Sequence, residues 1–148
     1  MELWQLSAFE VVSLLRKKKV GPLEVVQAAI DRVEEVDTKI NALPIKCFER
    51  ALEKAKKLNF NEELKNPISL LGLPIAVKDY NDLKGVKTTY GSPIYRNYIP
   101  ARSDATISKL EINGANPIGK SNVPEWAGGH TFNTVHGITR NPFNLKRT

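Results

Sequence analysis

The chain has 148 residues, which is enough for one domain with a core of ordinary size. Hydrophobic residues make up 41% and charged residues 26%, a composition typical of a globular chain and unlike that of a disordered one. The 22 lysines and arginines outnumber the 16 acidic residues, which gives a net charge of +6 that lies partly in Arg16–Lys19 and at the C-terminus. No aromatic residues interleave with these basic runs, so we expect no nucleic-acid partner.

Cys47 is the single cysteine, which excludes an internal disulfide framework and favours a reducing compartment. No apolar run reaches the length of a membrane span, and the first residues, MELWQLSAFE, lack the basic start of a signal peptide. We therefore expect a cytoplasmic protein without membrane attachment. His130 and His136 lie in a loop without a neighbouring cluster of carboxylates or cysteines, so we expect no metal and no cofactor.

The first third of the chain is predicted to be helical. Ser7 and Glu10 form a capping-box pattern, Gly21 ends the first helix, and Pro22 begins the second. A third helix is expected over residues 48–58, after a short strand within 41–46. The apolar positions at helical spacing are Ala8, Val11, Val12 and Leu15, then Val26, Ala29, Ile30 and Val33, then Ala51, Leu52, Ala55 and Leu58. We divide the chain into a helical region, residues 1–62, and a core region, residues 63–148, that forms one incomplete domain.

The pattern changes after the polar link over residues 59–67. Ile75–Val77 is apolar without alternation, which predicts a strand buried on both faces. The long stretch rich in glycine, proline and threonine over residues 83–104 is expected to be packed and functional. A surface helix follows, with Ser103 as its N-cap and Gly114 as its end.

The stretch GANPIGKS, residues 114–121, matches G-x-x-x-x-G-K-[ST], the pattern of a phosphate-binding P-loop. A P-loop follows a buried strand and opens a helix. Here a helix precedes the stretch, and Pro124 lies where the next helix would run, at a cost of about 3 kcal/mol. Pro117 also lacks an N–H group that a phosphate would use. Both flanks therefore disfavour a nucleotide site.

Lys78 ends the apolar strand and precedes Asp79. The carboxyl end of a buried strand is where α/β proteins place functional groups. Alternatively, the side chain simply extends from the strand end into solvent. Position alone leaves both interpretations open. Asp79 and Asp82 are expected to accept hydrogen bonds from turn N–H groups.

Three motifs resemble those of the amidase signature enzymes. LLGLPIAVKDYND and GVKTTYGSP are similar to the family's G-x-P-x-x-V-K-D and T-T-x-G-S. SDATISKLEINGANPIGKSNVPEWAGG and VHGITRNPFN are similar to its D-A-T…G-K-[TS]-N-x-x-E-[FW] and G-x-[TS]-x-N-P-[WFY] segments. The match is close over about residues 70–148 and loose before them. One such motif is weak, but three in order are specific, and they imply that residues 114–121 form a structural turn.

The resemblance implies an α/β fold, namely the N-terminal part of the amidase signature fold, with a mixed sheet flanked by helices and preceded by N-terminal helices. It also implies an amidohydrolase that cleaves the C–N bond of a small-molecule amide with a nucleophilic serine, a bridging serine in a cis peptide and a lysine. A lysine can take the serine proton only when it is neutral, which burial favours. By resemblance, Lys78 is this base and Ala127 lies at the substrate cleft, where the alternative for Trp126 and Ala127 is a packing role.

The sequence ends at NPFNLKRT, ahead of the Gly/Ser-rich segment that carries both serines in the family. We therefore expect the 148 residues alone to be inactive, with Lys78 as the one triad member present. The alternative is a catalytically inactive truncated or split-gene homologue that acts as a subunit or a weak ligand-binding module. In both cases we expect uncovered apolar surface, and so self-association or a complementary C-terminal polypeptide as partner.

Overall fold

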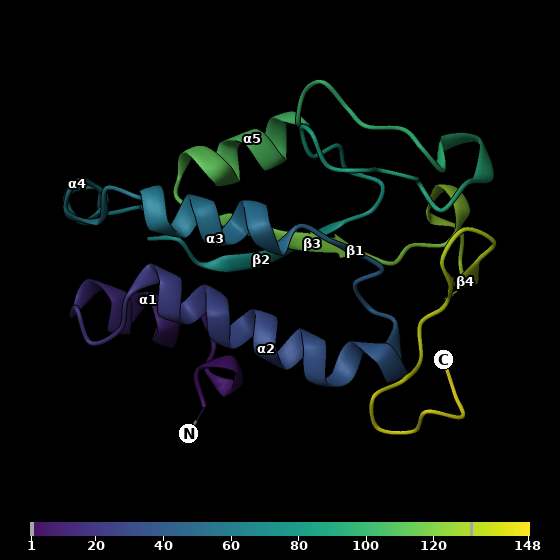
Figure 1. The fold of residues 1–148 in the computed structure, drawn as a ribbon, viewed down its shortest axis with the longest axis horizontal. Helices are drawn as coiled ribbons and strands as arrows, with labels where there is room; N and C mark the ends of the chain where they lie inside the picture. The colour runs from purple at the N-terminus through teal and green to yellow at the C-terminus, as the bar shows by residue number, and fades with distance from the viewer. Residues whose placement is uncertain (1, 131) are drawn as a thin grey trace.

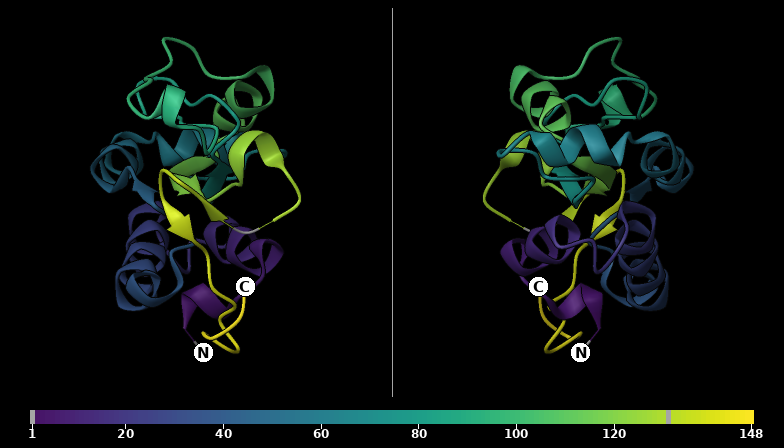
Figure 2. Two further views of the ribbon diagram at one scale, coloured as in Figure 1. Left: turned by 90° about the vertical axis from the view of Figure 1, so that its right-hand side faces the viewer. Right: turned by 90° about the vertical axis from the view of Figure 1, so that its left-hand side faces the viewer.

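The computed structural model describes residues 2–130 and 132–148, and a three-stranded mixed sheet lies at its centre (Figure 1). The strand order is β1-β3-β2, with β1 (Ile45–Lys46) antiparallel and β2 (Pro74–Lys78) parallel to β3 (Asn116–Ser121). Helices α1 (Ala8–Arg16) and α2 (Pro22–Ile40) lie on one side of the sheet, and α5 (Ala105–Ile112) lies on the other (Figures 1 and 2). The predicted α/β class and the mixed sheet flanked by helices are confirmed.

The remaining elements are short, apart from α3. They are α3 (Phe48–Lys57), α4 (Phe60–Lys65), the 3₁₀ turns η1 (Leu3–Gln5), η2 (Pro93–Tyr95) and η3 (Glu125–Ala127), and a hairpin of β4 (Phe132–Asn133) and β5 (Gly137–Ile138). No helix of the described residues is both long and apolar enough to cross a bilayer. Strand β1 from the first 62 residues pairs with β3 from the core region, while the division of the chain into two regions stays a prediction.

Local sequence signals set the helix ends. At the start of α1, Ser7 Oγ accepts the Glu10 N–H at 3.3 Å and the Glu10 carboxylate accepts the Ser7 N–H at 2.8 Å, which confirms the capping box. The expected polar link contains helix α4, which Asn59 caps by accepting the Glu62 N–H. The N-cap of α5 is Asp104 rather than Ser103, whose hydroxyl instead accepts the Lys84 N–H.

The C-terminal end of α2 is tied to the end of the chain. Asn41 ends the helix in the left-handed conformation, with φ of +59°, and its side-chain amide donates to the carbonyls of His136 and Ile138. Thr139 Oγ1 donates to the Asn41 carbonyl at 2.7 Å, and the Arg140 N–H donates to the last carbonyl of α2 at 2.9 Å. These bonds satisfy polar groups that a helix end leaves without partners.

The core consists of three apolar clusters around the sheet. Ile118 of β3 packs against α2 and α3, Leu71 packs against α1 and the start of α2, and Val77 of β2 packs against Ile107 of α5. The buried members are Val26, Ile30, Ala51, Ala55 and Ile118; Val11, Leu15, Val25 and Leu71; and Val77, Leu83, Val86 and Ile107. Of the predicted core positions, Ala8 is exposed, because the first turn of α1 extends beyond these clusters.

The structural turn assigned to residues 114–121 is wrong beyond Gly114, because Asn116–Ser121 is the buried central strand. Pro117 lies beside the register shift between β2 and β3, where the regular ladder is interrupted. Gly119 lets β1 approach closely, since a Cβ atom there would lie 2.7 Å from the Ile45 carbonyl oxygen. Gly114, at φ of +85°, does end α5 as predicted.

The expectation that the strand at Ile75–Val77 is buried on both faces is also wrong. In β2, Val77 is buried, whereas Ala76 and Lys78 are exposed. Side chains alternate between the faces of a strand, so Ala76 and Lys78 share the exposed face. Among the described residues, β2 is an edge strand of the sheet, and we call its exposed side with Ala76 and Lys78 the open face.

Candidate functional site

Lys78 lies at the carboxyl end of β2, on the open face. Its Nζ is 5.0 Å from the centre of the Tyr80 ring, in cation–π geometry. Ser121 of β3 is its register partner across the parallel ladder. The burial expected around the Lys78 amino group is absent among the described residues, in which Lys78 is exposed.

A tight turn follows Lys78. The Asn81 N–H donates to the Lys78 carbonyl at 2.9 Å, and the Asp79 N–H continues the ladder to the Ser121 carbonyl at 3.0 Å. The Asp79 carbonyl in turn accepts the Tyr90 N–H at 3.0 Å. The main chain on both sides of Lys78 is therefore held by hydrogen bonds to neighbouring segments.

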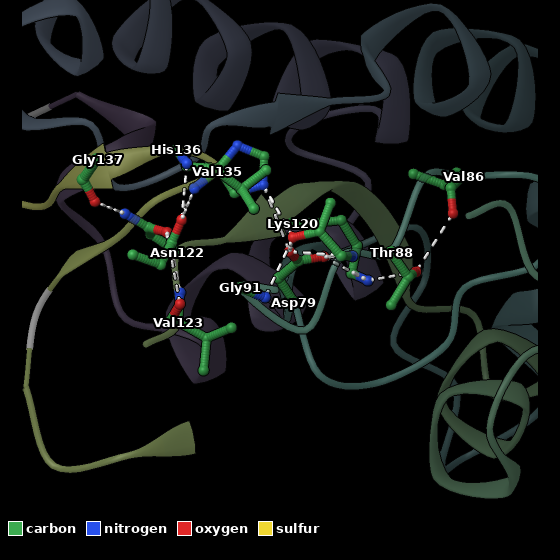
Figure 3. Close-up of polar contacts among 12 residues, drawn as sticks. Asp79, Val86, Thr88, Gly91, Lys120, Asn122, Val123, Val135, His136 and Gly137 are labelled. Carbon is green, nitrogen blue, oxygen red and sulfur yellow. Dashed lines mark hydrogen bonds and ion pairs between the residues drawn. The ribbon is translucent and has the colours of Figure 1, made fainter. Parts of the chain in front are cut away.

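A buried ion pair lies beneath this turn (Figure 3). Lys120 of β3 is fully buried, and its Nζ is 3.3 Å from Asp79 Oδ1, which is also fully buried. The same ammonium group donates to the Asn81 carbonyl and to Thr88 Oγ1, both at 2.8 Å. Two hydrogen bonds and an ion pair therefore compensate the buried charge of the ammonium group, as its burial requires.

Asp79 has a complete set of donors as well. The Thr89 N–H donates to the carboxylate at 3.1 Å, the Thr89 hydroxyl also donates to it, and His136 Nε2 lies 3.6 Å from it. Burial alone would raise the pKa of Asp79, but the hydrogen bonds from His136 and Thr89 and the charge of Lys120 outweigh it and hold the pKa below its usual range. Asp79 is therefore an anion in the folded protein at neutral pH.

The negative charge of Asp79 limits how far burial lowers the pKa of Lys120. Burial lowers the pKa of the Lys120 ammonium, while Asp79 acts in the other direction through its charge and hydrogen bond. His136, whose Nε2 lies 3.0 Å from Thr89 Oγ1, connects this pair to the β4–β5 hairpin. The cluster thus joins β2, β3, the loop that carries Thr88 and Thr89, and the β4–β5 hairpin.

Acid should destabilise the protein through Asp79. An aspartate with a lowered pKa contributes stability above its unfolded pKa of about 3.9, and this contribution is lost as the pH falls through the folded value. In the Asp79→Asn variant, the free energy of unfolding should therefore change less than in the wild type between about pH 5 and pH 2. Urea unfolding across this range measures the difference. Glu34→Gln, on an exposed position of α2, is the control, and an unchanged slope in Asp79→Asn would contradict the assignment.

Ala127 lies in η3, next to an aromatic cluster. Trp126 stacks on Tyr90 with ring centres 5.1 Å apart, and the Trp126 N–H donates to the Tyr90 carbonyl. Ala127 has φ of +60° and is exposed, and Trp126 is 58% exposed, so the alternative of a core packing role for Trp126 is wrong in this chain. The structure joins η3 to the turn after Lys78 through the main chain of Tyr90, and the role of Ala127 at a substrate cleft stays a prediction.

Sequence reasoning misses the cluster beneath Lys78. It places Lys120 in a turn and assigns Thr88, Thr89 and His136 no contacts with Lys120 or its partner. The two aspartates expected to accept turn N–H groups have different partners. The Asp79 carboxylate accepts a main-chain N–H, that of Thr89, whereas the Asp82 carboxylate accepts the Tyr90 hydroxyl at 2.6 Å. The sequence does contain one signal for this cluster, namely a second lysine, Lys120, in a largely apolar segment. If that segment is a buried strand, the lysine needs a buried anion as its partner. In the part of the chain that the structure describes, no group of three or more histidines, cysteines or acidic residues is placed to hold a metal.

The sequence and the mixed α/β core of this chain match those of known enzymes. A family model described as amidase matches residues 24–148. The chain therefore belongs to the amidase signature family. It is 40% identical over 149 residues to the A subunit of glutamyl-tRNA(Gln) amidotransferase from Sulfurihydrogenibium sp. (strain YO3AOP1), and 38% identical over 150 residues to the corresponding protein of Thermoanaerobacter pseudethanolicus. Both matches cover 99% of this chain, which spans 31% and 30% of those relatives' lengths.

Solved structures agree with this family. A bacterial aryl acylamidase of the amidase signature family is 32% identical, with a TM-score of 0.84 over 95% of this chain and 30% of its own. A fatty acid amide hydrolase is 26% identical, with a TM-score of 0.86 over 97% of this chain and 26% of its own. The chain thus spans between a quarter and a third of the length of these larger enzymes.

Proposed function

We propose that this chain supplies the general base, Lys78, of an amidohydrolase that cleaves the C–N bond of a small carboxylic amide. One observation supports the proposal most directly: Lys78 lies at the carboxyl end of β2 with its amino group on the open face. A nucleophile carried by another part of an amidase core could reach this amino group from that face. Family membership supports the reaction class.

The chemistry follows from the acid–base properties of lysine. The nucleophilic serine and the bridging serine are proposed to lie in polypeptide outside these 148 residues. Neutral Lys78 takes the proton of the nucleophile through the bridging serine, and the serine oxygen forms a bond to the amide carbon. The proton then passes to the leaving nitrogen as the C–N bond breaks, and water hydrolyses the acyl-enzyme. Covering the open face would remove water from the amino group and favour its neutral form.

Relatives point to a particular setting for this reaction. Those with 37–40% identity include several proteins named as the A subunit of glutamyl-tRNA(Gln) amidotransferase. By analogy, the amide nitrogen released by the proposed reaction would be passed on to an acceptor. We propose a cytoplasmic location on the same grounds, together with the single cysteine.

A chimera tests the proposal. This chain replaces the matching 149-residue segment of the Sulfurihydrogenibium relative, and amide hydrolysis and labelling by a serine-directed fluorophosphonate are measured. The chimera should turn over and be labelled outside the residues of this chain, whereas the 148-residue chain alone should show neither. Labelling of a serine within the 148 residues would contradict the proposal. If the chimera folds but forms the acyl-enzyme no faster than an unactivated serine would, the result would favour a catalytically inactive protein.

A further inference from the structure

The side chain of Lys120 is fully committed in the buried cluster. Its ammonium group donates hydrogen bonds to the Asn81 carbonyl and to Thr88 Oγ1, both at 2.8 Å, and lies 3.3 Å from Asp79 Oδ1 in an ion pair. It is fully buried, so it has no access to a substrate. Lys120 therefore cannot act as a base or bind a ligand, and its effect must pass through the residues that it holds.

One of these residues leads directly to Lys78. Asn81 accepts from Lys120 with its carbonyl and donates its N–H to the Lys78 carbonyl at 2.9 Å. Asp79, the ion-pair partner, is the residue next to Lys78 and continues the ladder to β3. The buried ammonium thus contacts two residues of the turn over 78–81, Asp79 and Asn81, from the side opposite the open face.

We propose that Lys120 is a positioning residue for Lys78, with its ammonium group fixing the Lys78–Asn81 turn so that the Lys78 amino group is held at the open face. This inference rests on the proposed function, since the position of Lys78 matters to the reaction only if Lys78 is the base. A buried ion pair contributes little more stability than well-packed apolar residues of the same volume. What it adds here is direction, because two hydrogen bonds and an ion pair from one atom fix β3, the Lys78–Asn81 turn and the loop at Thr88 relative to one another.

Two variants separate positioning from stability. Lys120→Met leaves Asp79 as an unpaired buried anion and should lower the free energy of unfolding strongly. Lys120→Met combined with Asp79→Asn removes both charges, keeps an acceptor for Thr89, and should recover much of that stability. In this double variant, hydrogen exchange of the Asn81 amide should accelerate by about tenfold or more, while exchange at Ile30 in the middle of α2 stays near the wild-type rate. Lys109→Met, on an exposed position of α5, is the matched control.

Turnover in the chimera gives the functional readout. The double variant should lower kcat by about 100-fold with little change in KM, because a small displacement of the base affects the chemical step more than substrate binding. Exchange at Asn81 in the 148-residue chain decides the structural claim even without turnover. Wild-type exchange at Asn81 in the double variant would overturn the inference and leave Lys120 as a stabilising residue. If instead the chimera stays active when Lys78 is replaced by alanine, the proposed function fails while the accelerated exchange at Asn81 remains, so the two failures are distinguishable.

Discussion

Replacement of Lys78 by alanine should abolish turnover in the chimera, with a fall in kcat of roughly 10⁴-fold or more, because a nucleophile and its base act as a unit. Lys78→Arg should fail to the same extent, since a guanidinium group stays charged and cannot accept the serine proton. Both variants should fold, because the Lys78 side chain is exposed and its one interaction among the described residues is with the Tyr80 ring. Steady-state kinetics and the rate of fluorophosphonate labelling measure the effect.

The control for this experiment is Lys56→Ala, which removes an exposed lysine from α3. It should leave kcat, KM and labelling at the level of the parent chimera. An active Lys78→Arg variant would reduce Lys78 to a structural cation and would require another base.

The second large effect concerns assembly of the 148-residue chain. The open face carries Ala76 beside Lys78 on the edge strand β2, and several large side chains are also exposed, among them Ile94 at 84% and Phe143 at 98%. An edge strand and uncovered apolar surface favour association with another chain. We expect light scattering to give the purified chain a molar mass above that of the monomer. We also expect the chain to bind a dye for apolar surface, unless a complementary C-terminal polypeptide covers that surface.

A single substitution tests the role of the edge strand. Ala76→Lys places a second charge on the open face and should shift the chain towards the monomer, because charge on an edge strand opposes strand pairing. Ala101→Lys, in an exposed loop, adds the same charge elsewhere and should leave the assembly state unchanged. A compact monomer of the wild-type chain at micromolar concentration that binds no dye would show that the described residues close their own core.

The sequence predicts those parts of the fold that depend on neighbouring residues. The capping box at Ser7, the start of α2 at Pro22 and the left-handed glycine at the end of α5 each involve contacts within a few positions, so their residue types suffice. The prediction that Gly21 ends the first helix is wrong: α1 ends at Arg16, Lys18 adopts the left-handed conformation with φ of +53°, and Gly21 is the N-cap of α2. The position of Lys78 at a strand end is predicted on the same basis. The family motifs then suggest a role for it that position alone leaves open.

Strand β3 and its lysine cannot be predicted in this way. Proline and glycine are turn residues in isolation, and they fit a central strand here because of a register shift against β2 and a close approach by β1. Both conditions come from segments that are distant in the chain. The pairing of Lys120 with Asp79 depends on the same register, so a strand that is taken for a turn also hides the buried cluster.

The bonds between the end of α2 and the C-terminal segment also constrain the order in which the chain can fold during synthesis. The partners of Asn41, namely the carbonyl of His136 and the hydroxyl of Thr139, are 95 and 98 residues further along. At a translation rate of about 5–20 residues per second, they leave the ribosome about 5–20 s after Asn41. During that interval the Asn41 N–H can bond to the Asp37 carbonyl, but the side-chain amide and the carbonyl of Asn41 have only water or transient partners. The bonds that tie the end of α2 to the C-terminal segment therefore form late, when nearly all of these 148 residues have been made.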